Sequence, residues 1–158
     1  SSYEVDVPLS FEQGLNIVYN DSIQDLNKDL NDLDKVGLKN MKVILSVDNA
    51  IPLKLQLKAE NVQIKDVYGN ELSAVKKTIE EDKQYVAESA DGEKPATSEL
   101  VLSLTSDDTA FLSKIDRICF KITAVPGSAT GVPLKDTQWL KITSIKLSVP
   151  GGVNVDLN

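Results

Sequence analysis

Hydrophobic and polar residues alternate with a period of two along several segments of this chain. In residues 3–11 the apolar positions are Tyr3, Val5, Val7, Leu9 and Phe11. Residues 41–47 and 53–59 repeat the pattern, which predicts strands that bury one face. Pro8 has no backbone N–H to donate to a ladder, so we expect the first strand to lie at a sheet edge.

Further strands are predicted at residues 98–105, 115–125, 139–149 and 153–157. The residues 48–52 and 66–70 between apolar runs contain Asp, Asn, Gly and Pro and predict turns. The polar interval 73–97 predicts a hairpin excursion or mobile loop around a weak strand at 84–88.

The strand at residues 139–149 does not keep its phase. Leu140 and Ile142 share one parity, whereas Ile145 and Leu147 share the other. One extra residue restores the inward face, so we predict a β-bulge at residues 143–144. The side chains expected to point inward between two sheets are Leu53, Leu55, Leu57, Ile118, Phe120, Ile122, Leu140, Ile142, Ile145 and Leu147.

One segment has a helical period. Ile23, Leu26, Leu30 and Leu33 are spaced three, four and three residues apart. Ser22 and Asp25 form a capping pair before this run, and Gly37 is a suitable residue after its end. The pattern predicts one short helix near residues 22–36, and a shorter helical turn is expected at 109–114.

Many short strands and one short helix predict a single all-β domain over residues 1–158. A two-sheet antiparallel β-sandwich is preferred over a barrel. With 41% hydrophobic residues, the chain of 158 residues has enough apolar material for a core.

The composition narrows the chemistry. The chain has no His, one Cys and one Met, which argues against histidine-dependent triads and most metal or thiol sites. We therefore expect no cofactor and no enzyme activity, and Cys119 is interpreted as a structural thiol. Acidic residues outnumber basic ones by 24 to 17, and the net charge of −7 predicts no nucleic-acid partner.

Two acidic patterns suggest chemistry and are interpreted as surface features. Residues 25–29 have the D-x-N-x-D spacing of a calcium loop, but Leu30 and Val36 occupy the positions that need Gly and Glu. The carboxylates at residues 80–82 and 107–108 stand in turn-like contexts. Solvated loop charges are preferred there over the acid/base pair of a glycoside hydrolase.

Trp139 is the one weak candidate for contact with a ligand. The strand phase assigns Leu140 and Ile142 to the core, so the indole is expected at the rim or the outer face of its sheet. Two roles would explain a Trp at this position. The indole contacts a sugar or a protein partner, or it only covers the end of the sheet.

Most of the chain from about Leu38 onward resembles the C-terminal part of surface lipoproteins of unassigned function from Bacteroides and its relatives. The segments that carry the resemblance are DNAIPL at residues 48–53, DVYGN at 66–70, IDRI at 115–118, QWLKI at 138–142 and GGVNVDLN at 151–158. The resemblance implies an exported β-sandwich at the cell surface or outer membrane. It also implies membrane association only through a lipid anchor upstream of Ser1, and two weak O-glycosylation candidates, Ser22 and Thr109.

Three functional hypotheses follow. The leading one is a non-catalytic, adhesin-like module of the cell envelope that binds a glycan or a surface protein, or has a structural role. The alternative from another class is a glycan-processing or glycan-binding accessory domain. The third is a pilus-like subunit that assembles by strand addition through its first or last strand.

Overall fold

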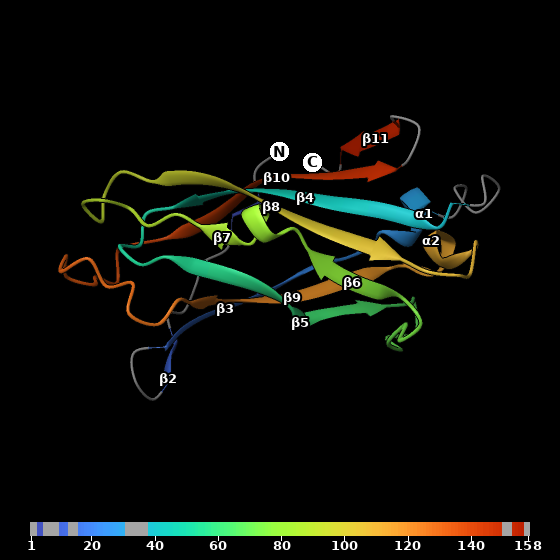
Figure 1. Ribbon diagram of the computed structural model, residues 1–158, viewed down its shortest axis with the longest axis horizontal. Coiled ribbons are helices and arrows are strands. Elements are labelled where there is room, and N and C mark those ends of the chain that lie inside the picture. The colour runs from blue at the N-terminus through green and yellow to red at the C-terminus, as the bar shows by residue number, and fades with distance from the viewer. Residues whose placement is uncertain (1–2, 5–9, 13–15, 31–37, 150–152, 157–158) are drawn as a thin grey trace.

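Two antiparallel sheets form a sandwich in the computed structural model, which describes residues 3–4, 10–12, 16–30, 38–149 and 153–156 (Figure 1). The first sheet contains β1 (Tyr3–Glu4), β4 (Asn40–Asn49), β6 (Lys76–Ile79), β8 (Ala96–Thr105), β10 (Leu140–Val149) and β11 (Val153–Asp156). The second contains β2 (Ser10–Glu12), β3 (Asn16–Ile23), β5 (Leu55–Lys65), β7 (Tyr85–Val86) and β9 (Arg117–Ala124). The helical turns are α1 (Asn27–Leu30), η2 (Glu81–Lys83) and α2 (Phe111–Lys114).

The strand order confirms the predicted all-β sandwich. In the first sheet the order is β1-β10-β4-β8-β6. Both β1 and β11 pair with the edge of β10 that faces away from β4: β1 pairs near the start of β10, and β11 pairs near its end. In the second sheet the order is β2-β3-β9-β5-β7. Within the described part of the chain, no helix has the length and apolar character needed to cross a bilayer.

The core lies between the two sheets and contains all ten side chains predicted for it, with exposed fractions from 0 to 8%. The predicted bulge is also confirmed, because the register between β10 and β4 shifts between Ile142 and Ser144. Ile145 and Leu147 consequently remain buried. Burying each such side chain contributes about 1.5–3 kcal/mol.

The helix predicted near residues 22–36 is much shorter where it is described. Ser22 and Ile23 are the last residues of β3, so Ser22 does not cap a helix. Asp25 has a φ of 60°, a left-handed conformation that separates this strand from α1 and cannot belong to a helix. Ile23, Leu26 and Leu30 are nevertheless buried. Leu33 and Gly37 lie outside the described residues.

The single strand predicted over residues 3–11 is wrong. Tyr3 pairs with Ile142 in the first sheet, whereas Phe11 pairs with Ile17 in the second. Pro8, on which the edge prediction rested, lies outside the described residues.

The interval 73–97 is more ordered than its sequence predicts. It contains β6, η2 and β7, and β6 pairs with β8 in the first sheet. The ammonium group of Lys77 in β6 donates a hydrogen bond to the carbonyl of Val62 in β5, which belongs to the second sheet. This segment therefore ties the two sheets together along one side of the sandwich.

The connections gather at the two ends of the long axis (Figure 1). At one end, which we call the loop end, lie the β4–β5, β7–β8 and β9–β10 connections. The turn between β5 and β6 lies at the opposite end, with α1 and α2. The eleven residues of β5 run from one end to the other, a length of roughly 35 Å.

Candidate functional site

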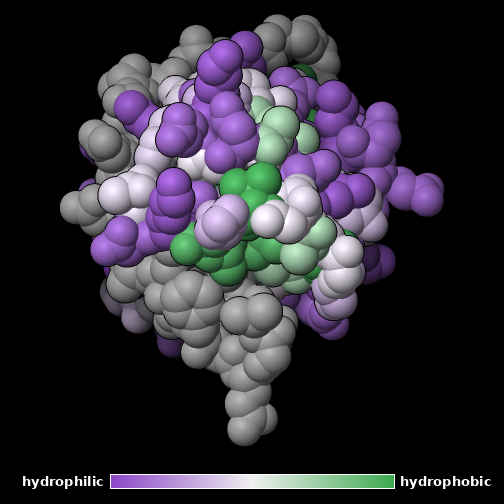
Figure 2. Space-filling view, turned by 90° about the vertical axis from the view of Figure 1, so that its left-hand side faces the viewer, coloured by the Kyte–Doolittle hydropathy of each residue, from purple (hydrophilic) through white to green (hydrophobic). Residues whose placement is uncertain are grey.

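A cleft of about 400 Å³ opens at the loop end, where the chain crosses from one sheet to the other. Pro52 and Leu53 of the β4–β5 connection line one side, and nine residues of the segment 124–134 line the other. Ser128 contributes the one polar side chain among these residues. Figure 2 looks onto this end and shows an apolar area near the centre of the face, with hydrophilic residues around much of it. We call this feature the loop-end cleft.

The two walls of the loop-end cleft are joined by hydrogen bonds. The Val125 N–H donates to the carbonyl of Lys54 at 2.8 Å, and the Thr130 hydroxyl donates to the carbonyl of Pro52 at 3.3 Å. The Ser128 hydroxyl donates to the carbonyl of Val125 at 2.7 Å. These polar groups are satisfied within the walls, so the cleft presents mainly apolar surface.

Asn49, at the end of β4, holds in place the β4–β5 connection, which forms the first wall of the cleft. Its side chain is fully buried, and Nδ2 donates to the carbonyls of Leu53 at 3.1 Å and Ala87 at 3.0 Å. Its Oδ1 accepts a hydrogen bond from the Ile51 N–H at 2.9 Å. One amide thus holds the β4–β5 connection against the strand end of β7.

Gln138 has the same role in the second wall. Its side chain is 6% exposed, with Nε2 donating to the carbonyl of Pro133 at 3.1 Å and Oε1 accepting from the Lys135 N–H at 3.0 Å. These bonds close the end of the β9–β10 connection. The cleft is therefore formed by two connections that buried amides hold in place.

The residues that line the cleft carry no charge, and charged side chains of both signs surround it. Asp136 follows Lys135, and Asp91 and Glu93 flank Gly92, where an added Cβ would lie 3.3 Å from Val132 of the lining. The segments 52–54 and 124–135 contain Lys54 and Lys135 and no Asp or Glu. The ammonium of Lys54 lies 4.2 Å from the centre of the Tyr85 ring, a cation–π contact that leaves its charge in place.

The β7–β8 loop beside the cleft is held by Asp91. Its Oδ1 accepts hydrogen bonds from the N–H groups of Lys94 at 2.8 Å and Glu93 at 2.9 Å. These backbone donors hold the pKa of the Asp91 carboxyl below its usual value. The carboxylate therefore stays ionised at neutral pH and stabilises the turn.

Trp139 lies at the loop end, next to the first residue of β10. Its side chain is 38% exposed, as the strand phase predicts, and its carbonyl accepts a hydrogen bond from the Ala50 N–H at 2.8 Å. Trp139 is not one of the described residues that line the loop-end cleft. Contact between Trp139 and a ligand stays a prediction.

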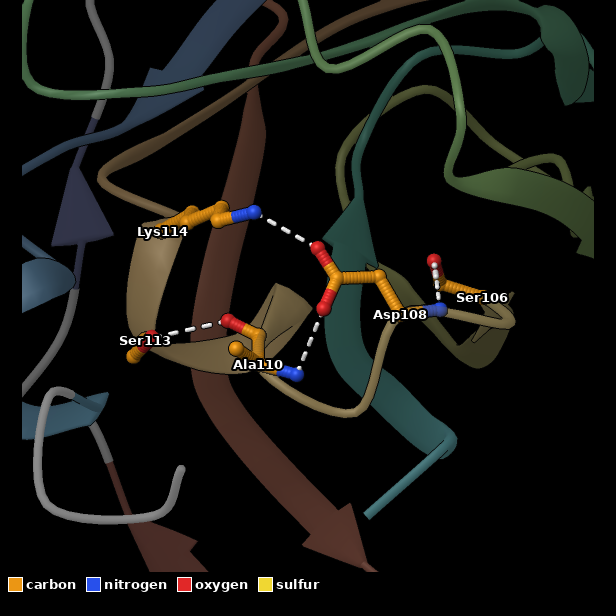
Figure 3. Close-up of polar contacts among 5 residues, drawn as sticks. All are labelled: Ser106, Asp108, Ala110, Ser113 and Lys114. Carbon is orange, nitrogen blue, oxygen red and sulfur yellow. Dashed lines mark hydrogen bonds and ion pairs between the residues drawn. The ribbon is translucent and has the colours of Figure 1, made fainter. Parts of the chain in front are cut away.

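Thr109, the second O-glycosylation candidate, lies exposed in the turn before α2 at the opposite end. Figure 3 shows the polar contacts of this turn: the Asp108 carboxylate contacts the Lys114 ammonium at 2.6 Å and accepts from the Ala110 N–H at 2.9 Å. The Lys114 side chain, followed by the Ala110 N–H, lowers the pKa of Asp108. These contacts hold the turn together, and Thr109 within it is exposed to solvent.

Ser22, the first O-glycosylation candidate, is half-buried in β3. Its hydroxyl accepts a hydrogen bond from Nε2 of Gln24 at 3.0 Å, and its N–H donates to Oδ1 of Asp21 at 2.7 Å. Of the two candidates, Thr109 is the more accessible, and modification of either stays a prediction.

The acidic residues considered as acid/base pairs lie in solvated positions. Glu80 contacts the Lys42 ammonium at 2.6 Å, and Glu81 and Asp82 are exposed in η2. Cys119 is half-buried in β9. Among the described residues, no group of three or more His, Cys, Asp or Glu is placed to hold a metal ion.

The turn between β5 and β6 displays two apolar side chains that the sequence reasoning missed. Val67 is 53% exposed and Tyr68 is 85% exposed. Oδ1 of Asp66 accepts from the N–H groups of Tyr68 and Asn70, both at 2.9 Å, and the Asp66 N–H donates to the Asn70 carbonyl at 2.9 Å. We call residues 66–71 the β5–β6 tip. The DVYGN sequence predicted the turn. The presence of Val67 and Tyr68 inside so short a turn was the sequence feature that could have predicted their exposure.

No protein-family model matches the chain, and a search of curated proteins finds no similar protein. The resemblance to Bacteroides surface lipoproteins consequently stays a prediction. The candidate function therefore depends on the geometry of the loop end.

Proposed function

We propose that this chain is a non-catalytic binding module of a bacterial cell envelope and that the loop-end cleft is its binding site. The observation that carries the proposal is the cleft itself, an apolar recess of about 400 Å³ between two anchored connections. Its volume lies near the lower end of the range for small-ligand sites, about 300–1,000 Å³. The envelope location and an upstream lipid anchor come from the resemblance to surface lipoproteins.

The cleft favours an apolar group, such as a side chain of a protein partner. Its wall carbonyls at Pro52, Lys54 and Val125 already accept hydrogen bonds from the chain itself. A polar ligand would lose its hydration without finding many free partners there. An apolar side chain gains free energy from leaving water.

Two exposed carboxylates near turns, Asp91 and Asp108, do not have the pKa shift expected of a general acid. The pKa of Asp91 and that of Asp108 are both lowered, because backbone N–H groups or an ammonium stabilise the ionised form. A general acid needs the opposite shift, toward neutral pH. Both carboxylates hold turns in their ionised state.

The test is a titration with N-acetyl-L-tyrosinamide, a small neutral mimic of an apolar side chain, followed by ¹H–¹⁵N NMR at low protein concentration. We expect the amide signals of residues 53–54 and of the segment 124–134 to shift. The variant Ala129→Glu places a longer charged side chain in the cleft lining and should abolish these shifts.

Ala90→Glu is the matched control for this titration. It introduces the same side chain at an exposed position of the neighbouring β7–β8 loop, outside the described cleft lining. It should leave the shifts unchanged. A wild-type titration with no shifts at the loop end, or shifts that survive in Ala129→Glu, would overturn the proposal.

The exposure of Trp139 favours a second candidate, glycan binding, because a sugar ring stacks on an indole face. A glycan array probed with the wild type and with Trp139→Ala tests it. Glycan binding predicts a signal that disappears in the variant while thermal stability changes little. An array without a signal for the wild type would count against this candidate.

A further inference from the structure

The ladder between β5 and β9 in the second sheet is interrupted by an irregularity in β5. Leu57 pairs with Ile122, and the next registered pair is Val62 with Phe120. β5 therefore advances five residues where β9 advances two, so β5 carries three extra residues within the segment 58–61. A bulge of this kind opens the ladder and changes the direction of nearby side chains, and bulges are common next to active sites.

A recess of about 310 Å³ lies beside this bulge, and we call it the sheet-face recess. The register pairs Asn20 with Lys121 and Gln63 with Cys119. Because Cys119 and Lys121 alternate with buried residues of β9, they lie on the face of the sheet that is turned away from the core. The described lining comes from three neighbouring strands and shares no residue with the loop-end cleft: Asn20 and Asp21 of β3, Glu60, Asn61 and Gln63 of β5, and Cys119, Phe120 and Lys121 of β9.

Free hydrogen-bonding groups converge on this recess. The side chains of Asn20, Asn61 and Gln63 make no hydrogen bond to another described residue. Those of Glu60 and Lys121 make neither a hydrogen bond nor an ion pair within the described part of the chain. Each amide both donates and accepts, the carboxylate accepts and the ammonium donates. The recess thus offers donors and acceptors together, whereas the polar groups of the loop-end cleft are paired within its walls.

The charges in the lining disfavour an ion as the ligand. The carboxylates of Asp21 and Glu60 repel an anion, and the ammonium of Lys121 repels a metal ion. Phe120, the aromatic residue of the described lining, is only 4% exposed and offers no ring face for stacking. A neutral ligand that carries several donors and acceptors fits these groups best.

From these observations we propose that the sheet-face recess binds a neutral sugar unit of a glycan. Each hydroxyl of a sugar ring both donates and accepts a hydrogen bond, so one ring can use the amides, the carboxylate and the ammonium at once. The volume of about 310 Å³ lies at the lower end of the range for small-ligand sites, about 300–1,000 Å³, which favours a single sugar unit. This inference adds a second site, on another face and for another class of ligand, and does not depend on the loop-end cleft.

A ¹H–¹⁵N NMR titration of the full chain with the methyl glycosides of glucose, mannose, galactose and N-acetylglucosamine tests the inference. At least one of the four should shift the amide signals of residues 20–21, 60–63 and 119–121 and leave those of 124–134 in place. N-acetyl-L-tyrosinamide has amide groups but no sugar ring, and it should not shift the signals of the recess.

Two variants remove hydrogen-bonding groups from the recess. Gln63→Ala should raise the Kd for the bound glycoside about two- to tenfold, as expected for one hydrogen bond between neutral groups. Glu60→Ala should raise it about tenfold or more, because hydrogen bonds to a charged group are stronger. Both positions are exposed, so neither variant should unfold the chain. Lys58→Ala is the matched control, since Lys58 is exposed on the same bulge but outside the described lining, and the Kd should not change.

The results also separate the recess from the loop end. Trp139→Ala and Ala129→Glu should leave the glycoside shifts unchanged, because both residues lie outside the described lining of the recess. A response that is lost in Trp139→Ala and kept in Gln63→Ala would assign sugar binding to the loop end and overturn the proposal. A spectrum that responds to none of the four glycosides would overturn it too. So would equal shifts with N-acetyl-L-tyrosinamide, or variants at positions 60 and 63 that bind like the wild type. The N-acetyl-L-tyrosinamide titration tests the cleft separately, so the failure of one site leaves the other proposal in place.

Discussion

The side-chain amide of Gln138 lies directly against Gly92, so close that a Cβ at position 92 would be 2.5 Å from Nε2 of Gln138. Gln138 closes the β9–β10 connection, and Gly92 belongs to the β7–β8 loop. Gly92 also has a φ of 75°, in the left-handed region. This contact fastens the loop beside the cleft to one of the cleft walls.

Gly92→Ala should therefore lower the free energy of unfolding by about 2–4 kcal/mol, from backbone strain together with the clash against a buried amide. Urea denaturation measures this loss. Gly127→Ala is the matched control, because Gly127 has the same φ of 75° but no atom within 4 Å of the added Cβ. Its loss should be about 1 kcal/mol. Equal losses in the two variants would contradict the packing argument.

The buried amide of Asn49 provides a second test. Asn49→Ala leaves two carbonyls and one N–H without their partner, and the expected loss is about 3 kcal/mol in the free energy of unfolding. Asp48→Ala removes a neighbouring half-buried side chain that accepts from the Thr97 hydroxyl, and its effect should stay below about 1 kcal/mol. A loss for Asn49→Ala no larger than that of Asp48→Ala would show that the amide is not the anchor of this wall.

Part of this structure follows from sequence patterns. The bulge in β10 was predictable, because Leu140 and Ile145 are both strongly apolar and have opposite parity, which only an extra residue reconciles. The helical spacing also picked out Ile23, Leu26 and Leu30, which are buried, but it predicted the wrong secondary structure for Ile23. Their spacing fits a helix, whereas pairing of β3 with β9 and the left-handed backbone of Asp25 make the first of them part of a strand.

The candidate sites were less predictable, because they depend on contacts between distant segments. Lys54 and Val125 are 71 positions apart, and their hydrogen bond joins the walls of the cleft. The exposure of Tyr68 was equally hidden, since a tyrosine near a strand is usually assigned to a buried face. Trp139 was placed correctly because the phase of a single strand was sufficient.

The partial exposure of Trp139 predicts an intermediate contribution to stability. Trp139→Ala should lower the free energy of unfolding by about 1 kcal/mol, whereas Leu140→Ala, at a position that is 1% exposed, should lower it by about 2–5 kcal/mol. Chemical denaturation of the two variants measures the difference. A larger loss for Trp139→Ala than for Leu140→Ala would mean that the indole is a core side chain.

The turn around Asp108 predicts a defined pH dependence. The Lys114 ammonium and the Ala110 N–H keep the pKa of Asp108 below its usual 3.8, so the carboxylate stabilises the folded chain above that pH. This contribution is lost as the pH falls through the lowered pKa, because both states are then protonated. The melting temperatures of the wild type and Asp108→Asn should differ most at neutral pH and converge as the pH falls below the lowered pKa of Asp108. A gap that widens on acidification would contradict the assignment.

The most direct test of the central claim, that the loop-end cleft binds an apolar group, is the ¹H–¹⁵N NMR titration of the wild type with N-acetyl-L-tyrosinamide. The amide signals of residues 53–54 and 124–134, which include the residues that line the cleft, should shift as the compound is added. Signals from the middle of β4 and β8 should stay in place. A spectrum without shifts at the loop end, or one in which signals shift throughout both sheets, would contradict the claim.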